Sequence, residues 1–286
     1  MSARQGADNL RVYSAPEVAS HYAALDYLTP CEKFLFSTYL KPGAAILDVG
    51  VGGGRTTPYL ASTASRYAGL DYSEKMIRLC RERFPQLEFL VSDASDLVTF
   101  EDASFDAVIM AFNVLDYVLP AEKRRQCLRE CRRVLRPQGL FIFSSHNPRA
   151  VLIYPAWDRD RLLVLGRKWV SEASGFLPAA ILVLTVAKWL HSWLRAAAGS
   201  AVRVIRRCFK LAFWHGEGCL VDPVHGGLVT HYWIPARAVA ELEQCGFHMV
   251  RCMGDDYPRA SRLWVTDWYY YVFEKTDRVA AGSPCV

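Results

Sequence analysis

Ile46-Leu-Asp-Val-Gly-Val-Gly-Gly-Gly-Arg-Thr-Thr57 is the stretch that decides the fold of this 286-residue chain. Its first four residues are apolar apart from Asp48 and indicate a short buried strand, which the run of glycines ends. Thr56, Thr57 and Pro58 suit the first turn of a helix. A strand, a glycine turn and a helix N-terminus let backbone N–H groups approach a ligand with no Cβ atom in the way. The stretch therefore predicts a ligand site at the end of the first strand.

The spacing of the glycines distinguishes between two kinds of ligand site. The dinucleotide pattern G-x-G-x-x-G, started at Gly50, would place Arg55 where its third glycine belongs, so it fits badly. A D-x-G-x-G-x-G pattern fits without a mismatch, as Asp48, Gly50, Gly52 and Gly54. In these residues the chain resembles the class I S-adenosylmethionine-dependent methyltransferases, which belong to the broad methyltransferase-domain superfamily.

Strand-like and helix-like segments alternate along the rest of the chain. The pattern predicts a second strand that ends at residues 69–72, and further strands at 87–91, 105–111, 140–144, 246–250 and 268–273. It predicts helices at residues 30–40, 121–135 and 235–245, and another that begins at Ser73. A turn is expected at residues 136–139. Such alternation predicts a doubly wound, mostly parallel α/β sheet with ligands at the carboxyl ends of its strands. The resemblance implies the seven-stranded, Rossmann-like methyltransferase fold, whose last two strands form an antiparallel hairpin.

We expect five parts in the chain. They are N-terminal helices that cover the cofactor site (residues 1–45), the cofactor-binding core (46–149), a helical insertion after the fifth strand (150–230), the C-terminal part of the core (231–275) and a disordered tail (276–286).

The insertion carries the surplus positive charge of the protein, whose net charge is +5. No acidic residue lies between Glu172 and Glu217, whereas six cations do: Lys188, Arg195, Arg203, Arg206, Arg207 and Lys210. Over residues 202–213 the cations and the apolar residues fall on adjacent faces of a helix. Three interpretations stay open: a lid or the interface of a homodimer, attachment of residues 173–216 to an anionic membrane surface, and, least favoured, a nucleic-acid surface.

Cysteine spacing and hydropathy bear on metal binding and location. The nine cysteines contain no C-x-x-C pair, which predicts that the protein holds no metal. The N-terminus lacks the apolar core of a signal peptide, and the apolar run at 175–187 is well short of the ~20 residues of a spanning helix. We therefore expect a cytoplasmic protein, peripheral on the inner membrane face if the insertion binds lipid.

The resemblance implies how the cofactor would be held. The glycine loop would hold its amino-acid end, and Asp48 would order that loop. Asp71 would accept both ribose hydroxyls, because an ionised carboxylate offers two acceptor oxygens. Asp93 would accept from the adenine amino group, and the backbone N–H of Ala94 would donate to the base. Other residues assigned to the cofactor are Tyr72, Met76, Asn113 and Val114, with Tyr13 and Tyr22, for which packing of helix on sheet is an equal alternative.

Methyl transfer from a sulfonium needs in-line positioning and, for a poor nucleophile, removal of its proton. His146 follows the fifth strand at the predicted active rim and is the candidate general base, because histidine titrates near working pH. A structural histidine bonded to a loop carbonyl is the alternative interpretation. His231, beside Tyr232 and Trp233, is the other candidate base, and Asp116 is expected to orient an acceptor hydroxyl.

The expected function is enzymatic transfer of a methyl group from S-adenosylmethionine, leaving S-adenosylhomocysteine, to an oxygen of a small-molecule, saccharide or lipid-linked acceptor. After the fourth strand stands Asn113-Val-Leu-Asp116, not the Asn/Asp-Pro-Pro-aromatic turn of family members that methylate base amino groups or glutamine amides. Two alternatives remain: an RNA or other nucleic-acid methyltransferase that uses the basic insertion on phosphates, and a non-catalytic cofactor-binding module.

Overall fold

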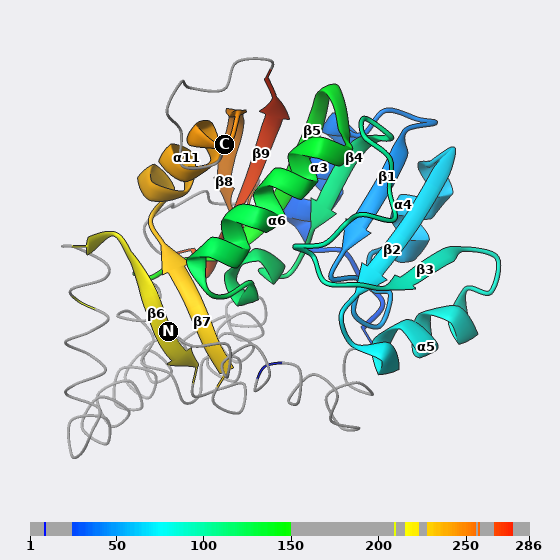
Figure 1. Ribbon diagram of the computed structural model, residues 1–286, viewed down its shortest axis with the longest axis horizontal. Helices are drawn as coiled ribbons and strands as arrows, with labels where there is room; N and C mark the ends of the chain where they lie inside the picture. The colour runs from blue at the N-terminus through cyan, green and yellow to red at the C-terminus, as the bar shows by residue number, and fades with distance from the viewer. Residues whose placement is uncertain are drawn as a thin grey trace, which may run out of the picture.

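The computed structural model describes residues 9, 25–149, 209, 215–222, 228–255, 257 and 266–276 (Figure 1). The predictions for Tyr13 and Tyr22, for residues 173–216 apart from 209, 215 and 216, and for the tail beyond residue 276 lie outside these residues.

A seven-stranded sheet in the order β3-β2-β1-β4-β5-β9-β8 forms the centre of the fold. Its strands are β1 (Ala45–Val49), β2 (Arg66–Asp71), β3 (Glu88–Val91), β4 (Phe105–Met110), β5 (Leu135–His146), β8 (Phe247–Gly254) and β9 (Trp268–Lys275). The first five are parallel, and β9 runs antiparallel to both β5 and β8. The doubly wound, mostly parallel sheet with its closing antiparallel hairpin is therefore confirmed.

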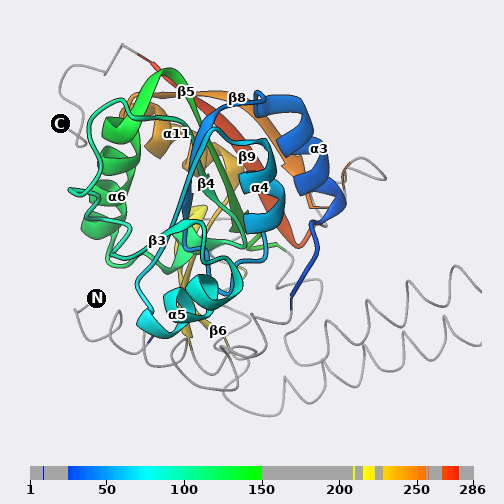
Figure 2. The ribbon, with the colours of Figure 1, turned by 90° about the vertical axis from the view of Figure 1, so that its right-hand side faces the viewer.

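Helices cover both faces of this sheet (Figure 2). On one face pack α3 (Pro30–Tyr39), α4 (Thr57–Thr63) and α5 (Glu74–Arg83), and on the other pack α6 (Ala121–Val134) and α11 (Pro235–Gln244). Helix α3 begins with a capping box, in which Thr29 and Glu32 each accept a hydrogen bond from the other's backbone N–H. Ser73 stands at the N-cap of α5 as predicted, but its hydroxyl makes no capping bond.

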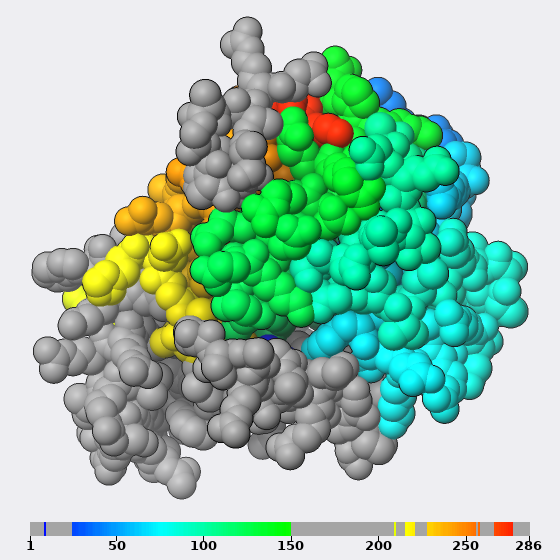
Figure 3. All heavy atoms as spheres, in the orientation of Figure 1, coloured from blue at the N-terminus to red at the C-terminus, as the bar shows by residue number. Residues whose placement is uncertain are grey.

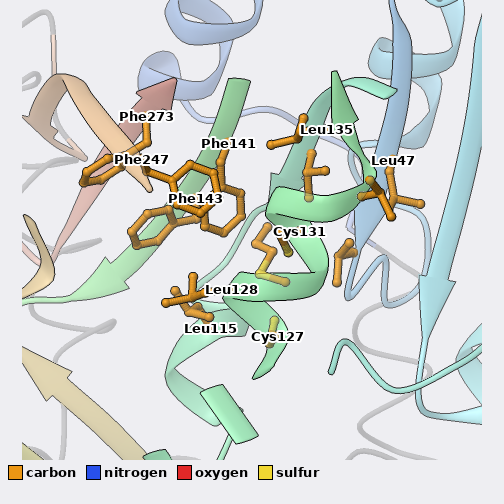
Figure 4. Packing of buried hydrophobic residues seen from close by; sticks show 14 of the residues in the cluster. Leu47, Leu115, Cys127, Leu128, Cys131, Leu135, Phe141, Phe143, Phe247 and Phe273 are labelled. Carbon is orange, nitrogen blue, oxygen red and sulfur yellow. The ribbon is translucent and has the colours of Figure 1, made fainter. Parts of the chain in front are cut away.

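The core on the α6 side is rich in aromatic rings (Figure 4). Phe143 stacks on both Phe141 and Tyr271, with ring centroids 4.9 Å apart in each pair. Cys127 and Cys131, one helical turn apart on α6, are fully buried in the same cluster. Because α6 and β5 bury these side chains together, the carboxyl ends of β4 and β5 are held next to the start of α6.

The predicted turn at residues 136–139 is a bulge inside β5, not a loop before it. Leu135 pairs with Phe105 and Leu140 pairs with Ala107, so the residues between them lie opposite Asp106 alone. Arg136 donates to both carboxylate oxygens of Asp106, at 2.8 and 2.7 Å, which holds the bulge against β4.

Residues 217–233 contain a second sheet that the sequence analysis missed. Strands β6 (Glu217–Asp222) and β7 (Leu228–Trp233) pair antiparallel, so the expectation of helix throughout 150–230 is wrong for these segments. Leu228-Val-Thr-His-Tyr-Trp233 is rich in β-branched and aromatic residues, which favour a strand. On the face shown in Figure 3, these yellow strands and the orange α11 lie beside the green α6. Strand β7 contacts β5 and the 3-10 helix η1 (Val114–Tyr117).

Within the described segments, no helix has the length and apolar character needed to cross a membrane.

Candidate active site

A cavity of about 320 Å³ lies at the carboxyl ends of β1, β2 and β4, where the doubly wound topology places ligands. The predicted cofactor residues that line it are Asp48, Gly50, Gly52, Asp71, Tyr72, Met76, Asp93, Ala94 and Val114. Among the other described predictions, Gly54, Asn113, Asp116, His146 and His231 do not line it. Several other residues that were not predicted also line the cavity, among them Arg55, Phe112, Tyr117 and Lys123.

Asp48 anchors the glycine loop to the start of α4. Its Oδ2 accepts hydrogen bonds from Thr56 Oγ1 at 2.7 Å and from the Tyr67 hydroxyl at 3.0 Å. Burial raises the pKa of Asp48 to about 6, although both hydrogen bonds favour the charged form. Asp48 is thus tied by hydrogen bonds to the N-cap residue of α4 and to β2, on either side of the glycine loop.

Two glycines of the loop are required for different reasons. Gly50 has φ +73°, and a Cβ there would lie 2.5 Å from a methyl group of Val114. Gly54 has φ +85°, and a Cβ there would meet the Phe84 ring at 2.8 Å. The first glycine therefore admits the Val114 side chain to the cavity wall, whereas the second lets α5 pack beneath the loop.

Asp71 ends β2 and lies across the cavity from η1. Its Oδ2 accepts from the backbone N–H of Gly52 at 3.0 Å, and its Oδ1 accepts from that of Ser73 at 2.9 Å. Burial raises the pKa of Asp71 to about 6, while the backbone donors oppose that rise. Each oxygen keeps further acceptor capacity, so a diol can bind to the ionised carboxylate.

Asp93 is held by residues on two sides. Lys123, from the start of α6, donates to its Oδ2, and Ser95 donates from both its backbone N–H and its hydroxyl to Oδ1. Partial burial would raise the pKa of Asp93, but the hydrogen bonds from Lys123 and Ser95 outweigh it and lower that pKa. Asp93 is therefore ionised and fixed in the wall of the cavity.

A buried ion pair connects the glycine loop to α3. Arg55 donates to both carboxylate oxygens of Glu32, at 2.7 and 2.6 Å, and to the carbonyl of Tyr27 at 2.8 Å. Its guanidinium carbon lies 3.9 Å from the centre of the Phe112 ring. The position of Arg55 directly after the glycines was the available signal, but its partner is 23 residues away in the sequence.

His146, at the end of β5, forms a hydrogen-bonded group with the residues that follow β4. Its Nδ1 is 2.7 Å from Asp116 Oδ2, and its Nε2 is 3.2 Å from Asn113 Nδ2. The fully buried Asp116 also accepts from the backbone N–H of His146 and from Ser145 Oγ, each at 2.7 Å. Because a carboxylate only accepts, Nδ1 carries the proton of the neutral ring and Nε2 keeps its lone pair.

The His146–Asp116 pair adjoins the cavity through Tyr117. The Tyr117 ring lines the cavity and meets the His146 ring edge to face, with centroids 6.1 Å apart. The structure thus brings together the two predicted residues His146 and Asp116, which are 30 positions apart in the sequence.

His231 lies apart from this group. Its ring packs against Trp233 at 4.9 Å, and its Nδ1 has no hydrogen-bond partner in the described structure. Burial, followed by the nearby charge of Arg124, lowers the pKa of His231 well below its usual value. Arg124 itself is buried, pairs with Glu241 of α11 at 2.9 Å and stacks over Trp233. A neutral His231 in this setting belongs to the packing between β7, α6 and α11.

No cluster of histidine, cysteine or acidic side chains suited to a metal ion occurs among the described residues.

Comparisons with known proteins agree on one family. A model for a methyltransferase domain matches residues 47–143. The chain is 33% identical over 169 residues to a demethylmenaquinone methyltransferase of Clavibacter sepedonicus. The aligned residues make up 56% of this chain and 67% of that protein. It is 38% identical over 121 residues to a fatty-acid O-methyltransferase of Mycolicibacterium smegmatis, covering 41% of this chain but only 42% of that protein.

A third relative matches over a similar length. The chain is 37% identical over 123 residues to a phthiotriol/phenolphthiotriol dimycocerosates methyltransferase of Mycobacterium tuberculosis, covering 41% of this chain and 43% of that protein. The match therefore spans less than half the length of the second and third relatives.

Solved structures show the same fold. The 1,6-didemethyltoxoflavin-N1-methyltransferase of Burkholderia thailandensis, bound to 1,6-didemethyltoxoflavin and S-adenosylhomocysteine, superposes with a TM-score of 0.55 at 15% identity, over 95% of this chain and 87% of that one. The PH0226 protein of Pyrococcus horikoshii OT3 superposes with a TM-score of 0.53 at 20% identity. The superposition covers 92% of this chain and 93% of that one.

Proposed function

Because the chain belongs to the class I S-adenosylmethionine-dependent methyltransferases, we propose that it methylates a hydroxyl oxygen of a small-molecule, saccharide or lipid-linked acceptor, with His146 as the general base. The bound cofactor supplies an electrophilic methyl group on a sulfonium. The observation that carries the proposal is the 2.7 Å contact between His146 Nδ1 and Asp116, next to the cofactor cavity.

The cavity residues fit S-adenosylmethionine. The loop at Gly50 and Gly52 leaves backbone beside the cavity wall, where the amino-acid end of the cofactor would lie. Asp71, whose Oδ2 accepts from the loop at Gly52, would accept the two ribose hydroxyls. Asp93 and Ala94 would contact the adenine edge, between the side chains of Met76 and Val114. These roles for the lining residues are part of the proposal.

The role of Asp116 differs from the one expected from sequence. Its two oxygens already accept three hydrogen bonds from Ser145 and His146, and its side chain is fully buried. We therefore assign Asp116 to the orientation of the imidazole rather than of the acceptor. It keeps the proton of His146 on Nδ1 and would stabilise the imidazolium that forms when Nε2 takes the acceptor proton.

The named relatives favour apolar acceptors. Demethylmenaquinone, fatty acids and phthiotriol dimycocerosates are all lipids or lipid-linked compounds. A lipid-linked acceptor also fits the basic insertion, because anionic membranes attract Lys/Arg segments by about 1 kcal/mol per charge. The membrane attachment is testable by co-sedimentation with phosphatidylglycerol vesicles. The wild type should bind the vesicles and dissociate from them at high salt. A variant that combines Arg203→Gln, Arg206→Gln, Arg207→Gln and Lys210→Gln should not bind them. Equal sedimentation of both proteins would contradict this attachment.

The direct test of the reaction uses methyl-labelled S-adenosylmethionine and acceptor pools of lipids, saccharides and small hydroxyl compounds. We expect base-stable methyl ether in one pool with the wild type, and its loss with His146→Ala while S-adenosylhomocysteine still binds. Full turnover by His146→Ala would remove the base from the proposal. Methyl label in nucleic acid would favour a nucleic-acid methyltransferase. Cofactor binding with no turnover in any pool would favour a non-catalytic binding module.

A further inference from the structure

The segment after β4 has an unusual backbone. Phe112 and Asn113 follow each other with φ +56° and +63°. Asparagine tolerates this left-handed region, but a bulky residue such as phenylalanine rarely adopts it, and such outliers concentrate at functional sites. The conformation places Phe112 on the cavity wall and directs the Asn113 amide toward His146. Ser144 Oγ accepts from the backbone N–H of Asn113 at 2.8 Å and supports this turn.

Asn113 carries an unused acceptor. Its Nδ2–H group donates to His146 Nε2, because the proton of the neutral imidazole is held on Nδ1 by Asp116. Its Oδ1 is buried and has no hydrogen-bond partner among the described residues. Buried polar atoms are normally paired, so this oxygen points to a ligand that donates a hydrogen bond beside Nε2.

Aromatic rings from four separate elements surround the same place. The Tyr232 ring on β7 lies 5.3 Å from the His146 ring, and the Tyr117 ring on η1 lies 6.1 Å from it. Trp268 is the cross-strand neighbour of His146 in the β5–β9 register, so the two side chains share a face, and its ring lies 6.0 Å from that of Phe112. The Trp268 Nε1–H group is buried and has no described partner.

We propose that Asn113, His146 and these aromatic rings form the acceptor site, and that the acceptor is a hydroxyl group on a planar aromatic ring. This assignment rests on the proposed function. The ring would pack among the aromatic side chains, and its O–H would donate to Asn113 Oδ1 on binding. During transfer the Asn113 amide N–H leaves Nε2, the phenolic O–H proton passes to the lone pair that this frees on Nε2, and the oxygen forms the new bond to the methyl carbon. The carbon–sulfur bond breaks with its electron pair going to sulfur, so the charge moves from the sulfonium to the imidazolium.

The chemistry of the site separates three kinds of acceptor. An imidazole takes a proton from a phenol (pKa ~10) far more easily than from an aliphatic alcohol, whose O–H resembles that of water (pKa ~15.7). A carboxylate acceptor needs no base and would be repelled by Asp116. Arg55, a cation on the cavity wall, is already paired with Glu32. The site therefore favours a phenol over an alcohol and over a carboxylate.

Three matched probes test this specificity: 2-naphthol, its saturated counterpart decahydro-2-naphthol, and 2-naphthoic acid. Binding to the protein loaded with S-adenosylhomocysteine is measured by calorimetry. We expect 2-naphthol to bind at least tenfold tighter than either of the others. Equal or tighter binding of the alcohol or of the carboxylate would overturn the proposal.

Two variants connect the specificity to the named residues. Asn113→Gly keeps the left-handed backbone and removes the side-chain amide. It should lower the affinity for 2-naphthol about tenfold and leave the affinity for S-adenosylhomocysteine unchanged. Tyr232→Leu should weaken 2-naphthol similarly, whereas Tyr232→Phe, which keeps the ring, should not. If either Asn113→Gly or Tyr232→Leu folds and binds 2-naphthol as tightly as the wild type, the proposed acceptor site is wrong.

Turnover distinguishes failure of this inference from failure of the proposed function. Methylation of another acceptor by a protein that ignores 2-naphthol would refute the aromatic site and leave the methyltransferase proposal standing. Specific 2-naphthol binding without methyl transfer to any acceptor would refute the proposed reaction and leave the binding site.

Discussion

The two halves of the site are built in different ways. The cofactor half comes from short stretches: Asp48 to Thr56 form one turn, and Asp71 and Ser73 another. The proposed acceptor half joins Asn113, His146, Tyr232 and Trp268, which come from three strands and the turn after β4 and are spread over more than half of the chain. A short motif can therefore identify the cofactor, whereas the acceptor site exists only after the sheet has formed.

The difference has a functional meaning. In our proposal the cofactor half would hold one constant ligand with backbone groups and acids, which a fixed motif can encode. The acceptor half is assembled on the loop after β4, on the end of β5 and on β7, where residue changes alter the acceptor without disturbing the cofactor. Substitutions in one half should therefore leave the other half unaffected.

His146→Gln gives the largest expected effect and belongs to the acceptor half. The turnover number should fall about 10²- to 10⁴-fold, because a general base typically contributes that much. The dissociation constant of S-adenosylhomocysteine, measured by calorimetry, should stay within twofold. A parallel loss of cofactor affinity would show that the two halves are not independent.

Gly50→Ala attacks the cofactor half through packing. Its Cβ would overlap Val114 at a φ of +73°, so we expect the free energy of unfolding to fall by about 2–5 kcal/mol, measured by urea titration. Gly43→Ala is the matched control, because it has φ +79° with nothing within 4 Å of the added carbon. The control should lose only about 1–2 kcal/mol for its backbone. Adding Val114→Ala to Gly50→Ala should restore part of the difference, and equal losses at Gly50 and Gly43 would contradict the packing argument.

Asp71→Asn sharpens the assignment of the ribose. Charged hydrogen bonds contribute about 1.5–3 kcal/mol, so the affinity for S-adenosylhomocysteine should fall roughly 10- to 100-fold at pH 8. In our proposal the ionised form of Asp71 would bind the diol, and burial raises the pKa of Asp71 to about 6. Wild-type affinity should therefore be constant at high pH and weaken as the pH falls through 6. The variant should show a flatter profile, though not a flat one, because Asp48 titrates near the same pH. An unchanged profile would move the ribose away from Asp71.

Lys123→Met gives the smallest effect. The Lys123–Asp93 pair is about 40% exposed on each side, at 41% and 39%, and such pairs contribute at most about 1 kcal/mol. We expect cofactor affinity to fall two- to fivefold, measured by calorimetry. Arg125→Met is the control, because Arg125 pairs with Glu122 on the same helix and does not line the cavity. If the two substitutions lower cofactor affinity equally, Lys123 affects the cofactor only through the stability of α6.

Much of the fold could be predicted because its signals are local. The glycine spacing from Asp48, the alternation of strands and helices, and the acid at the end of β2 all act over a few residues. Strands β6 and β7 were missed because they lie outside that alternation, within a region read from its charge. The bulge at 136–139 was read as a turn, since Pro137 and Gly139 give the same signal in both settings.

The site was predictable only one residue at a time. His146 and Asp116 were each candidates, but their contact depends on the alignment of β5 with the turn after β4, which a single sequence does not reveal. The same holds for Arg55 and Glu32, which meet only because α3 packs beside the glycine loop. Trp268 and Tyr232 reach His146 through strand pairing and packing between two sheets.

The independence of the two halves is tested most directly by measuring two quantities on the same two variants. Cofactor affinity and the single-turnover rate at saturating S-adenosylmethionine are determined for Asp71→Asn and for His146→Gln. We expect Asp71→Asn to lose cofactor affinity and keep most of its rate, whereas His146→Gln should lose rate and keep its cofactor affinity. A His146→Gln protein with the wild-type single-turnover rate would contradict the role of His146 and the division of the site.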